Sequence, residues 1–347
     1  MLSRLTVDLD ALAHNYGVLK AAAGEAEVAP VIKADGYGLG VGPIARRLHA
    51  EGADTFFIAR LEEGEALRRE LGDRKAVILV LDGALHGAHE RLKAAGLTPV
   101  MTGPEQVAAW KDHPIVLHVD TGMNRAGVTL EEAHALAKKG FTPDLVMSHL
   151  GSAADPADPR NGRQLERFRE ARALFPNARA SLAASSGIFL GEPYRFDMVR
   201  PGISLFGGGP REVVDERFKA VATLTAPILQ VRDVFAGEQA SYGSTFTAPR
   251  DVKIAVIACG YADGLLRAAH GRASAILHGK AAPLVYVTMD LIGLDVTEIL
   301  AARPGDEAQL LGPLARLDEL ANAIGTAAHE CLVRLGGRSE RVYLGAH

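Results

Sequence analysis

At 347 residues the chain is longer than one ordinary domain, which predicts two. Hydrophobic residues make up 48% and charged residues 23%, as is usual for a soluble globular protein. Lys and Arg number 38 against 42 Asp and Glu, a net charge of −4 without any basic block, so neither nucleic acid nor an anionic membrane is an expected partner. No apolar run is long enough for a membrane span.

The first residues and the cysteines indicate the cellular compartment. Asp8 and Asp10 stand where a signal peptide would be apolar. Cys259 and Cys331 offer neither a disulfide framework nor the spacing of a zinc site, and the histidines show no ligand spacing. We therefore expect a cytoplasmic protein without a metal.

Short apolar runs alternate with helical patterns over the first 210 residues. The helical patterns include 61–71 and 129–140, the second with Thr129 and Glu132 as a capping box and Gly140 as a stop. Several runs are apolar on both faces, as in strands covered by helices on one side and a filled interior on the other. The eight runs cover residues 28–34, 55–59, 76–83, 97–103, 115–122, 144–151, 178–186 and 196–207.

Eight strands spaced by helices predict an α/β fold, a (β/α)8 TIM barrel. An open doubly wound sheet is the alternative, but no Gly-x-Gly-x-x-Gly follows the first strand. After Gly208 the pattern changes to short β-rich runs at 227–234, 253–260, 273–279 and 283–290, which indicate a C-terminal mainly-β domain. We expect a hinge at 209–219, one helical stretch at 314–335 and a last strand at 339–345.

Polar side chains follow several of the predicted barrel strands. In such barrels the carboxyl ends of the strands build the active site. Lys33 ends the first strand, and a single lysine of this kind is more often a solvated surface charge. That interpretation weakens because other strand ends also carry polar groups: Asp120, Arg125, His149, Ser185, Ser186 and Arg200.

A lysine amine beside glycine-rich turns suits Schiff-base chemistry with pyridoxal 5'-phosphate. That cofactor needs an anion cradle. The stretches 185–187 (SSG) and 200–204 (RPGIS) offer hydroxyls and backbone N–H groups that glycine leaves accessible. The hydroxyl of Tyr37, on the turn after Lys33, could add a further hydrogen bond to the phosphate.

At these residues the chain resembles a known family. VIKADGYGLG (31–40) is similar to the cofactor-lysine motif of alanine racemases, which are fold-type III pyridoxal-phosphate enzymes. The resemblance continues in family order over nearly the whole chain, through VDLDALAHNY, HVDTGMNRAGV, MSHLGSAAD, MVRPGISLFG, SYGSTFTA, GYADGL and TMD. It implies a homodimeric isomerase that interconverts L-alanine and D-alanine and supplies D-alanine for peptidoglycan. The implied domains are a cofactor-binding barrel at 8–210 and a β domain at 1–7 plus 211–347.

The resemblance also implies a role for each site residue. Lys33 would hold the cofactor covalently and act as the base on one face of the substrate, with Tyr242 from the partner subunit as the base on the other. Arg200 would face the pyridine nitrogen, and His149 would link Arg200 to Tyr242. Arg125 would lie near the cofactor oxygen and the substrate carboxylate. The phosphate would be held by Tyr37, Ser186, Gly202 and Ile203, and the substrate or its entrance bordered by Met289, Asp290 and Tyr261.

Each of these residues also has an ordinary structural interpretation. Taken alone, Tyr242 fits a hairpin tyrosine. His149 fits a core histidine with satisfied hydrogen bonds, and Arg200 fits an ion pair at the barrel rim. Tyr261 fits a turn aromatic nearly as well as an entrance residue.

Three positions depart from the family pattern. Leu335 stands where many members carry a phosphate-binding tyrosine, and Tyr286 stands where an arginine is usual. These changes make serine and other small amino acids plausible substrates. His118 replaces a lysine that becomes carbamylated in many members, and we expect a neutral ring there, close to Arg125 directly or through an anion, with packing alone as the competing interpretation.

Two further functions stay open. A non-catalytic pyridoxal-phosphate carrier built on the same barrel is disfavoured by the β domain. A barrel-type amino-acid decarboxylase would need an acidic residue in place of Arg200.

Overall fold

The computed structural model describes residues 3–85, 87–110, 114–335 and 337–345. The chain divides into two compact units, and each is described by itself. One covers residues 13–205 with 209–211, and the other covers the remaining described chain, including both ends. The domain bounds of 8–210 and 1–7 plus 211–347 stay a prediction.

The first unit is built on a ring of parallel strands. Six of them form one parallel sheet in chain order, and the first and last strands of the unit pair with each other. Parallel bridges from Val31 to Phe57 and from Ala184 to Arg200 join that pair to the sheet on both sides. The strands are β2 (Glu27–Val28), β3 (Thr55–Ile58), β4 (Val77–Val80), β5 (Leu97–Met101), β6 (Val116–His118), β7 (Leu145–Met147), β8 (Arg179–Ser181) and β9 (Met198–Val199). The predicted (β/α)8 barrel is confirmed.

Apolar side chains fill the inside of this barrel. One buried cluster draws residues from nearly every strand: Ala29, Phe57, Leu79, Val100, Val116, Leu145, Met147 and Met198. The interior is therefore a packed core, which leaves the carboxyl ends of the strands as the place for a site.

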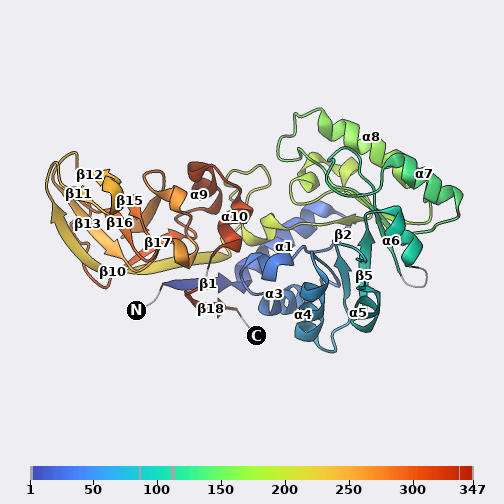
Figure 1. The fold of residues 1–347 in the computed structure, drawn as a ribbon, viewed down its shortest axis with the longest axis horizontal. Coiled ribbons are helices and arrows are strands. Elements are labelled where there is room, and N and C mark those ends of the chain that lie inside the picture. Colours follow the sequence, from blue (N-terminus) through green and yellow to red (C-terminus); the bar gives the residue numbers. More distant parts are fainter. Residues whose placement is uncertain (1–2, 86, 111–113, 336, 346–347) are drawn as a thin grey trace. The chain divides into compact units, whose positions relative to one another are not determined.

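Helices of the barrel unit lie around the outside of its strands (Figure 1). The helix predicted at 61–71 is present with those bounds, and the predicted capping box is formed, since Glu132 N donates to Thr129 Oγ1 (3.1 Å) and Thr129 N donates to Glu132 Oε2 (2.8 Å). The helices are α2 (Lys33–Tyr37), α3 (Val41–Ala50), α4 (Leu61–Leu71), α5 (His89–Ala94), α6 (Pro104–Ala109), α7 (Leu130–Lys138) and α8 (Arg160–Ala173), preceded by α1 (Leu9–Ala23). Short 3₁₀ helices follow the last strands at η1 (Gly187–Leu190), η2 (Glu192–Tyr194) and η3 (Ile203–Phe206).

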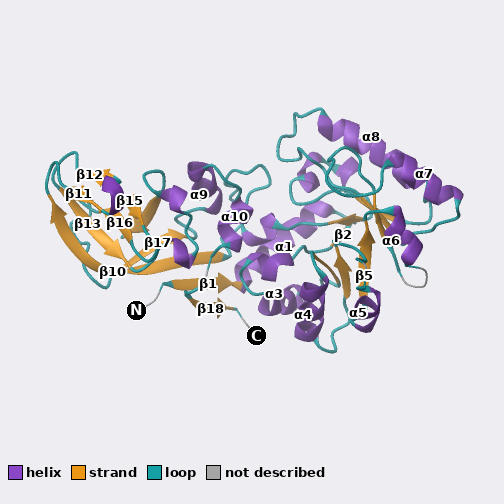
Figure 2. Cartoon of the chain, in the orientation of Figure 1, coloured by secondary structure: helices purple, strands orange, loops and turns teal. Residues whose placement is uncertain are grey.

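Strands and loops dominate the second unit, as predicted (Figure 2). Its large sheet has the order β13-β16-β15-β14-β17-β10-β1-β18, and β10 also pairs with β13, so six strands close into a small ring. The N-terminal strand β1 lies between β10 and β18. The strands are β1 (Arg4–Asp8), β10 (Ala222–Val234), β11 (Gln239–Ala240), β12 (Phe246–Thr247), β13 (Val252–Ile257), β14 (Ser274–Leu277), β15 (Lys280–Val287), β16 (Ile292–Asp295), β17 (Glu307–Leu311) and β18 (Glu340–Leu344).

The single helical stretch predicted at 314–335 is wrong. Two short helices occupy it, α9 (Leu317–Ile324) and α10 (Ala328–Val333). Gly325 takes a left-handed conformation with φ 73° and ends α9, as glycine commonly does after a helix. Three 3₁₀ turns complete this unit: η4 (Tyr242–Ser244), η5 (Tyr261–Asp263) and η6 (Arg267–Ala269). Within the described chain, every helix is too short or too polar to cross a membrane.

Candidate active site

Lys33 follows β2, two residues after the bridge at Val31, and opens an unusual turn. The four residues after it, Ala34 to Tyr37, all have positive φ angles between 53° and 62°. Side chains with a Cβ rarely adopt this left-handed conformation, which costs roughly 1–2 kcal/mol per residue. Backbone strain of this kind persists where the surrounding structure enforces it, and it is concentrated at functional sites.

The predicted basic residues at the carboxyl ends of the strands, here called the barrel mouth, lie close enough to shift one another's pKa values. Burial and the charges of Arg200 and Arg125 lower the pKa of His118 to about 4, although Asp120 opposes them. Burial and the same two arginines, helped by His118 and Lys33, lower the pKa of His149 to about 3. Both imidazoles are therefore neutral at pH 7, as we expected for His118.

Lys33 belongs to the same electrostatic cluster. Burial, followed by the charge of Arg125, lowers the pKa of its amine, while Glu63 and Asp82 raise it. A lysine with a lowered pKa spends more time as the neutral amine, which is the form that acts as nucleophile or base. The structure thus brings together five groups from the ends of four strands: Lys33, His118, Arg125, His149 and Arg200.

Arg200 is held rigidly and is 3% exposed. Its Nη1 donates to Ser181 Oγ and its Nη2 donates to the carbonyl oxygen of Ser148, each at 2.5 Å, and its guanidinium lies 5.8 Å from the centre of the Phe57 ring. These contacts fix the orientation of its guanidinium. Burial lowers the pKa of Arg200, but a guanidinium with such acceptors stays protonated.

Tyr37, Ser186, Gly202 and Ile203 gather near one corner of the barrel. The Tyr37 hydroxyl lies against Gly202, where an added Cβ would collide with it. Ser185 Oγ accepts hydrogen bonds from Gly202 N (2.9 Å) and Ser204 N (3.3 Å), which shapes the loop. Ser186 stands at the N-cap of η1, and Ile203 opens η3.

This corner fits an anion such as a phosphate. Burial raises the pKa of the Tyr37 phenol above its usual range, so its hydroxyl remains a hydrogen-bond donor. The Ser204 hydroxyl is buried and has no hydrogen-bond partner among the described residues. Buried polar groups are normally satisfied, so this hydroxyl without a partner fits a polar ligand at this corner.

The remaining predicted residues lie in the β-rich unit. Tyr242 is 83% exposed, in a turn between β11 and β12 where Ser241 has a positive φ of 70°. Two other loops run side by side, because Tyr261 N donates to Thr288 O and Ala262 N donates to Met289 O, each at 3.0 Å. The structure therefore brings Tyr261, Met289 and Asp290 together.

Sequence reasoning missed Arg338, which ties these two loops to each other. Its Nη2 and Nε donate to the buried carboxylate of Asp263 (2.9 and 3.1 Å), and its Nη1 donates to Asp290 Oδ1 (2.7 Å). The hydrogen bonds to the two carboxylates raise the pKa of Arg338 above its usual range. No local pattern could have identified this residue, because its partners lie 48 and 75 positions away in sequence.

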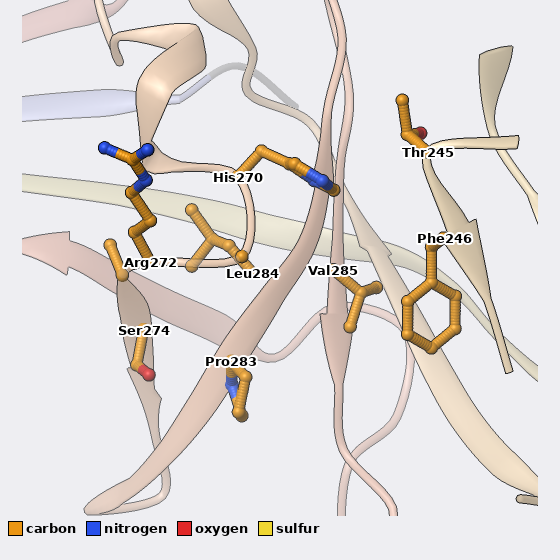
Figure 3. Close-up of a pocket in the computed structure, with 10 residues that line it drawn as sticks. Thr245, Phe246, His270, Arg272, Ser274, Pro283, Leu284 and Val285 are labelled. Atoms are coloured by element: carbon orange, nitrogen blue, oxygen red, sulfur yellow. The ribbon is translucent and has the colours of Figure 1, made fainter. Parts of the chain in front are cut away.

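An open depression of about 390 Å³ lies elsewhere in the β-rich unit. Figure 3 shows His270 between Arg272 on one side and the Thr245–Phe246 segment on the other. Its lining contains none of the predicted site residues. Across residues 3–85, 87–110, 114–335 and 337–345, no group of His, Cys, Asp and Glu side chains is arranged to hold a metal ion.

The fold and the mouth residues define a two-domain barrel enzyme with a strand-end lysine beside an anion-binding corner. Residues 7–210 match the alanine racemase N-terminal domain, and residues 221–343 match the alanine racemase C-terminal domain. The chain belongs to the alanine racemase family.

Relatives of full length support this membership. The chain is 45% identical to an alanine racemase of Rhizobium meliloti, covering 99% of this chain and 97% of that one. It is 42% identical to a biosynthetic alanine racemase of Agrobacterium fabrum, covering 98% and 93%. Among solved structures, the alanine racemase of Bartonella henselae, described with covalently bound pyridoxal phosphate, superposes with a TM-score of 0.93 at 33% identity over 99% of this chain and 100% of that one.

Proposed function

We propose that this protein is a pyridoxal-phosphate-dependent alanine racemase that interconverts L-alanine and D-alanine. One observation carries the proposal: a strained left-handed turn presents Lys33, with its pKa lowered, to a cluster of two arginines and two neutral histidines. Membership of the alanine racemase family supports racemisation of alanine as the reaction that this arrangement performs.

Pyridoxal phosphate, when bound, would supply an aldehyde that bonds to amines and a ring that accepts negative charge from the substrate. Lys33 would bond to it. The corner formed by Tyr37, Ser186, Gly202 and Ile203 would hold the phosphate through hydroxyl and backbone N–H groups. The Ser204 hydroxyl, which has no partner among the described residues, and the close approach of the Tyr37 hydroxyl to Gly202 support this placement.

Two arginines would orient the bound molecules, Arg200 the cofactor and Arg125 the substrate. Arg200 would face the pyridine nitrogen, and because it keeps its own proton that nitrogen would stay unprotonated. A cofactor ring with an unprotonated nitrogen would accept less negative charge from the substrate, which favours return of the proton to the α-carbon over side reactions. Arg125, exposed at the mouth, would bind the substrate carboxylate by charge-assisted hydrogen bonds.

Racemisation needs a base on each face of the α-carbon. One base takes the proton from one face, and the other delivers a proton to the opposite face, so no atom is gained or lost. Lys33 would serve one face, and Tyr242 of the partner subunit would serve the other, which makes the active unit a homodimer. The high exposure of Tyr242 within a single chain supports this arrangement.

The β-rich unit would set substrate breadth. Met289, Asp290 and Tyr261 would border the substrate, held by Arg338. Leu335, where many members carry a phosphate-binding tyrosine, is buried and offers no hydroxyl. We therefore propose activity toward serine and other small amino acids as a secondary function, with D-alanine for peptidoglycan as the main product in the cytoplasm.

Coupled assays on both enantiomers of alanine, serine and a panel of larger amino acids test this proposal. We expect alanine to turn over fastest in both directions, with an equilibrium constant of about 1 because enantiomers have equal free energies. Serine should follow at a lower rate. A protein that binds pyridoxal phosphate but converts no enantiomer would be a carrier, and this outcome would contradict the proposal.

A further inference from the structure

The left-handed turn after Lys33 must be held by contacts outside itself. Within the turn, Gly38 N donates to Ala34 O and Gly40 N donates to Asp35 O, each at 2.8 Å. Asp35 Oδ1 accepts from Val41 N (2.8 Å), which ties the end of the turn to α3. None of these bonds reaches the first peptide after Lys33, whose N–H belongs to Ala34.

Glu63 supplies that contact from a different strand end. Its Oε1 accepts a hydrogen bond from Ala34 N (3.0 Å), and its Oε2 accepts from Ala59 N (2.8 Å) and Arg60 N (3.3 Å). One half-buried carboxylate therefore joins the turn after β2 to the turn after β3. Each carboxylate oxygen accepts from a different turn, so one side chain connects the two turns.

Helix capping alone does not account for this arrangement. Glu63 is the third residue of α4, and Glu132 is the third residue of α7. Within the part of the chain that the structure describes, the Glu132 carboxylate bonds only the start of its own helix, where it accepts from Thr129 N. Glu63 makes the corresponding local bond and, in addition, the bond to Ala34 in another segment. The extra bond is what distinguishes the two residues.

We propose that Glu63 is a positioning residue for Lys33, a clamp that holds the strained turn so that the amine points into the barrel mouth. The inference rests on the proposed role of Lys33 but concerns a residue that would not touch substrate. Its negative charge has a second effect, since it raises the pKa of the Lys33 amine against burial and Arg125. Removing the charge should lower that pKa further.

The test compares Glu63→Gln with Glu132→Gln, which removes the same kind of cap away from the Lys33 turn. Glutamine is isosteric but has a single acceptor oxygen, so it keeps at most one side of the clamp. In the protein freed of cofactor, hydrogen exchange of the Ala34 amide should accelerate at least about tenfold in Glu63→Gln and remain unchanged in Glu132→Gln. Thermal midpoints of the two variants should be similar.

A second measurement follows the chemistry of Lys33. Borohydride trapping of added pyridoxal phosphate on Lys33, measured from pH 6 to 10, should have its midpoint at lower pH in Glu63→Gln than in wild type or Glu132→Gln. Unchanged exchange and an unchanged trapping profile in Glu63→Gln, or the same changes in both variants, would overturn the inference. If wild type is not labelled on Lys33, the proposed function fails, while the exchange of Ala34 still decides whether Glu63 is a clamp.

Discussion

The hydroxyl of Tyr37 lies against the backbone of Gly202, so closely that a methyl group at position 202 would collide with it. The contact joins the turn after β2 to the loop after β9, two segments far apart in sequence. Both residues belong to the corner proposed to hold phosphate. Glycine is therefore required at position 202 for space rather than for backbone conformation.

Gly202→Ala should weaken binding of pyridoxal phosphate by roughly 10-fold to 100-fold, equivalent to about 1.4–2.8 kcal/mol. The added Cβ displaces the Tyr37 hydroxyl, which removes one of the proposed phosphate contacts. Titration of the cofactor-free protein by absorbance measures the affinity. Gly162→Ala is the control, because that helical glycine has open space around it. Equal affinity in Gly202→Ala and wild type would count against the phosphate corner.

His118 should make the cofactor-free protein less stable in mild acid. The pKa of His118 is about 4 in the folded protein, against 6.5 for an unperturbed histidine in the unfolded chain. Between these two pH values the unfolded chain therefore binds more protons than the folded protein. The free energy of unfolding should therefore fall as the pH drops below 6.5. His118→Gln should make this dependence shallower by up to about 1.4 kcal/mol per pH unit.

Urea unfolding between pH 4.5 and 8 measures that slope. His134→Gln, the same change at an exposed imidazole, is the control. A slope that is identical in His118→Gln and wild type would show that His118 titrates normally.

A neutral imidazole forms no carbamate, so wild-type activity should be the same in buffers with and without bicarbonate.

The proposed sharing of each site between subunits can be tested by mixing inactive variants. Lys33→Ala and Tyr242→Phe should each lower turnover by roughly 10²-fold or more, because each removes one base. After subunit exchange, some mixed dimers would hold one intact site, and activity should recover toward a quarter of the wild-type value. No recovery, despite exchange verified by mass spectrometry, would argue that both bases come from one chain.

Sequence patterns predicted the barrel well because its physical signal is local. Each of the eight apolar runs contains strand residues, and the capping box of Thr129 and Glu132 is formed as expected. The prediction of a single helical stretch at 314–335 is wrong. The sequence contains a signal for the break, because a glycine such as Gly325 in a helical pattern can end the helix.

The contacts that organise the site were not predictable in the same way. Ala34 and Asp35 give no local sign of left-handed backbone, because that conformation is imposed by partners such as Glu63. Arg338 holds carboxylates far away in sequence, which only the folded chain brings close. Local periodicity therefore predicts which strand end carries a side chain, whereas long-range hydrogen bonds determine the orientation of that side chain.

The central claim is that Lys33 is the residue that bonds to pyridoxal phosphate, and its most direct test is chemical. The protein loaded with cofactor is reduced with borohydride, digested, and mapped by mass spectrometry. We predict a pyridoxyl group on Lys33 alone, and no labelled peptide together with no racemase activity in Lys33→Ala. A pyridoxyl group on another lysine, or racemisation by Lys33→Ala at the wild-type rate, would contradict the account.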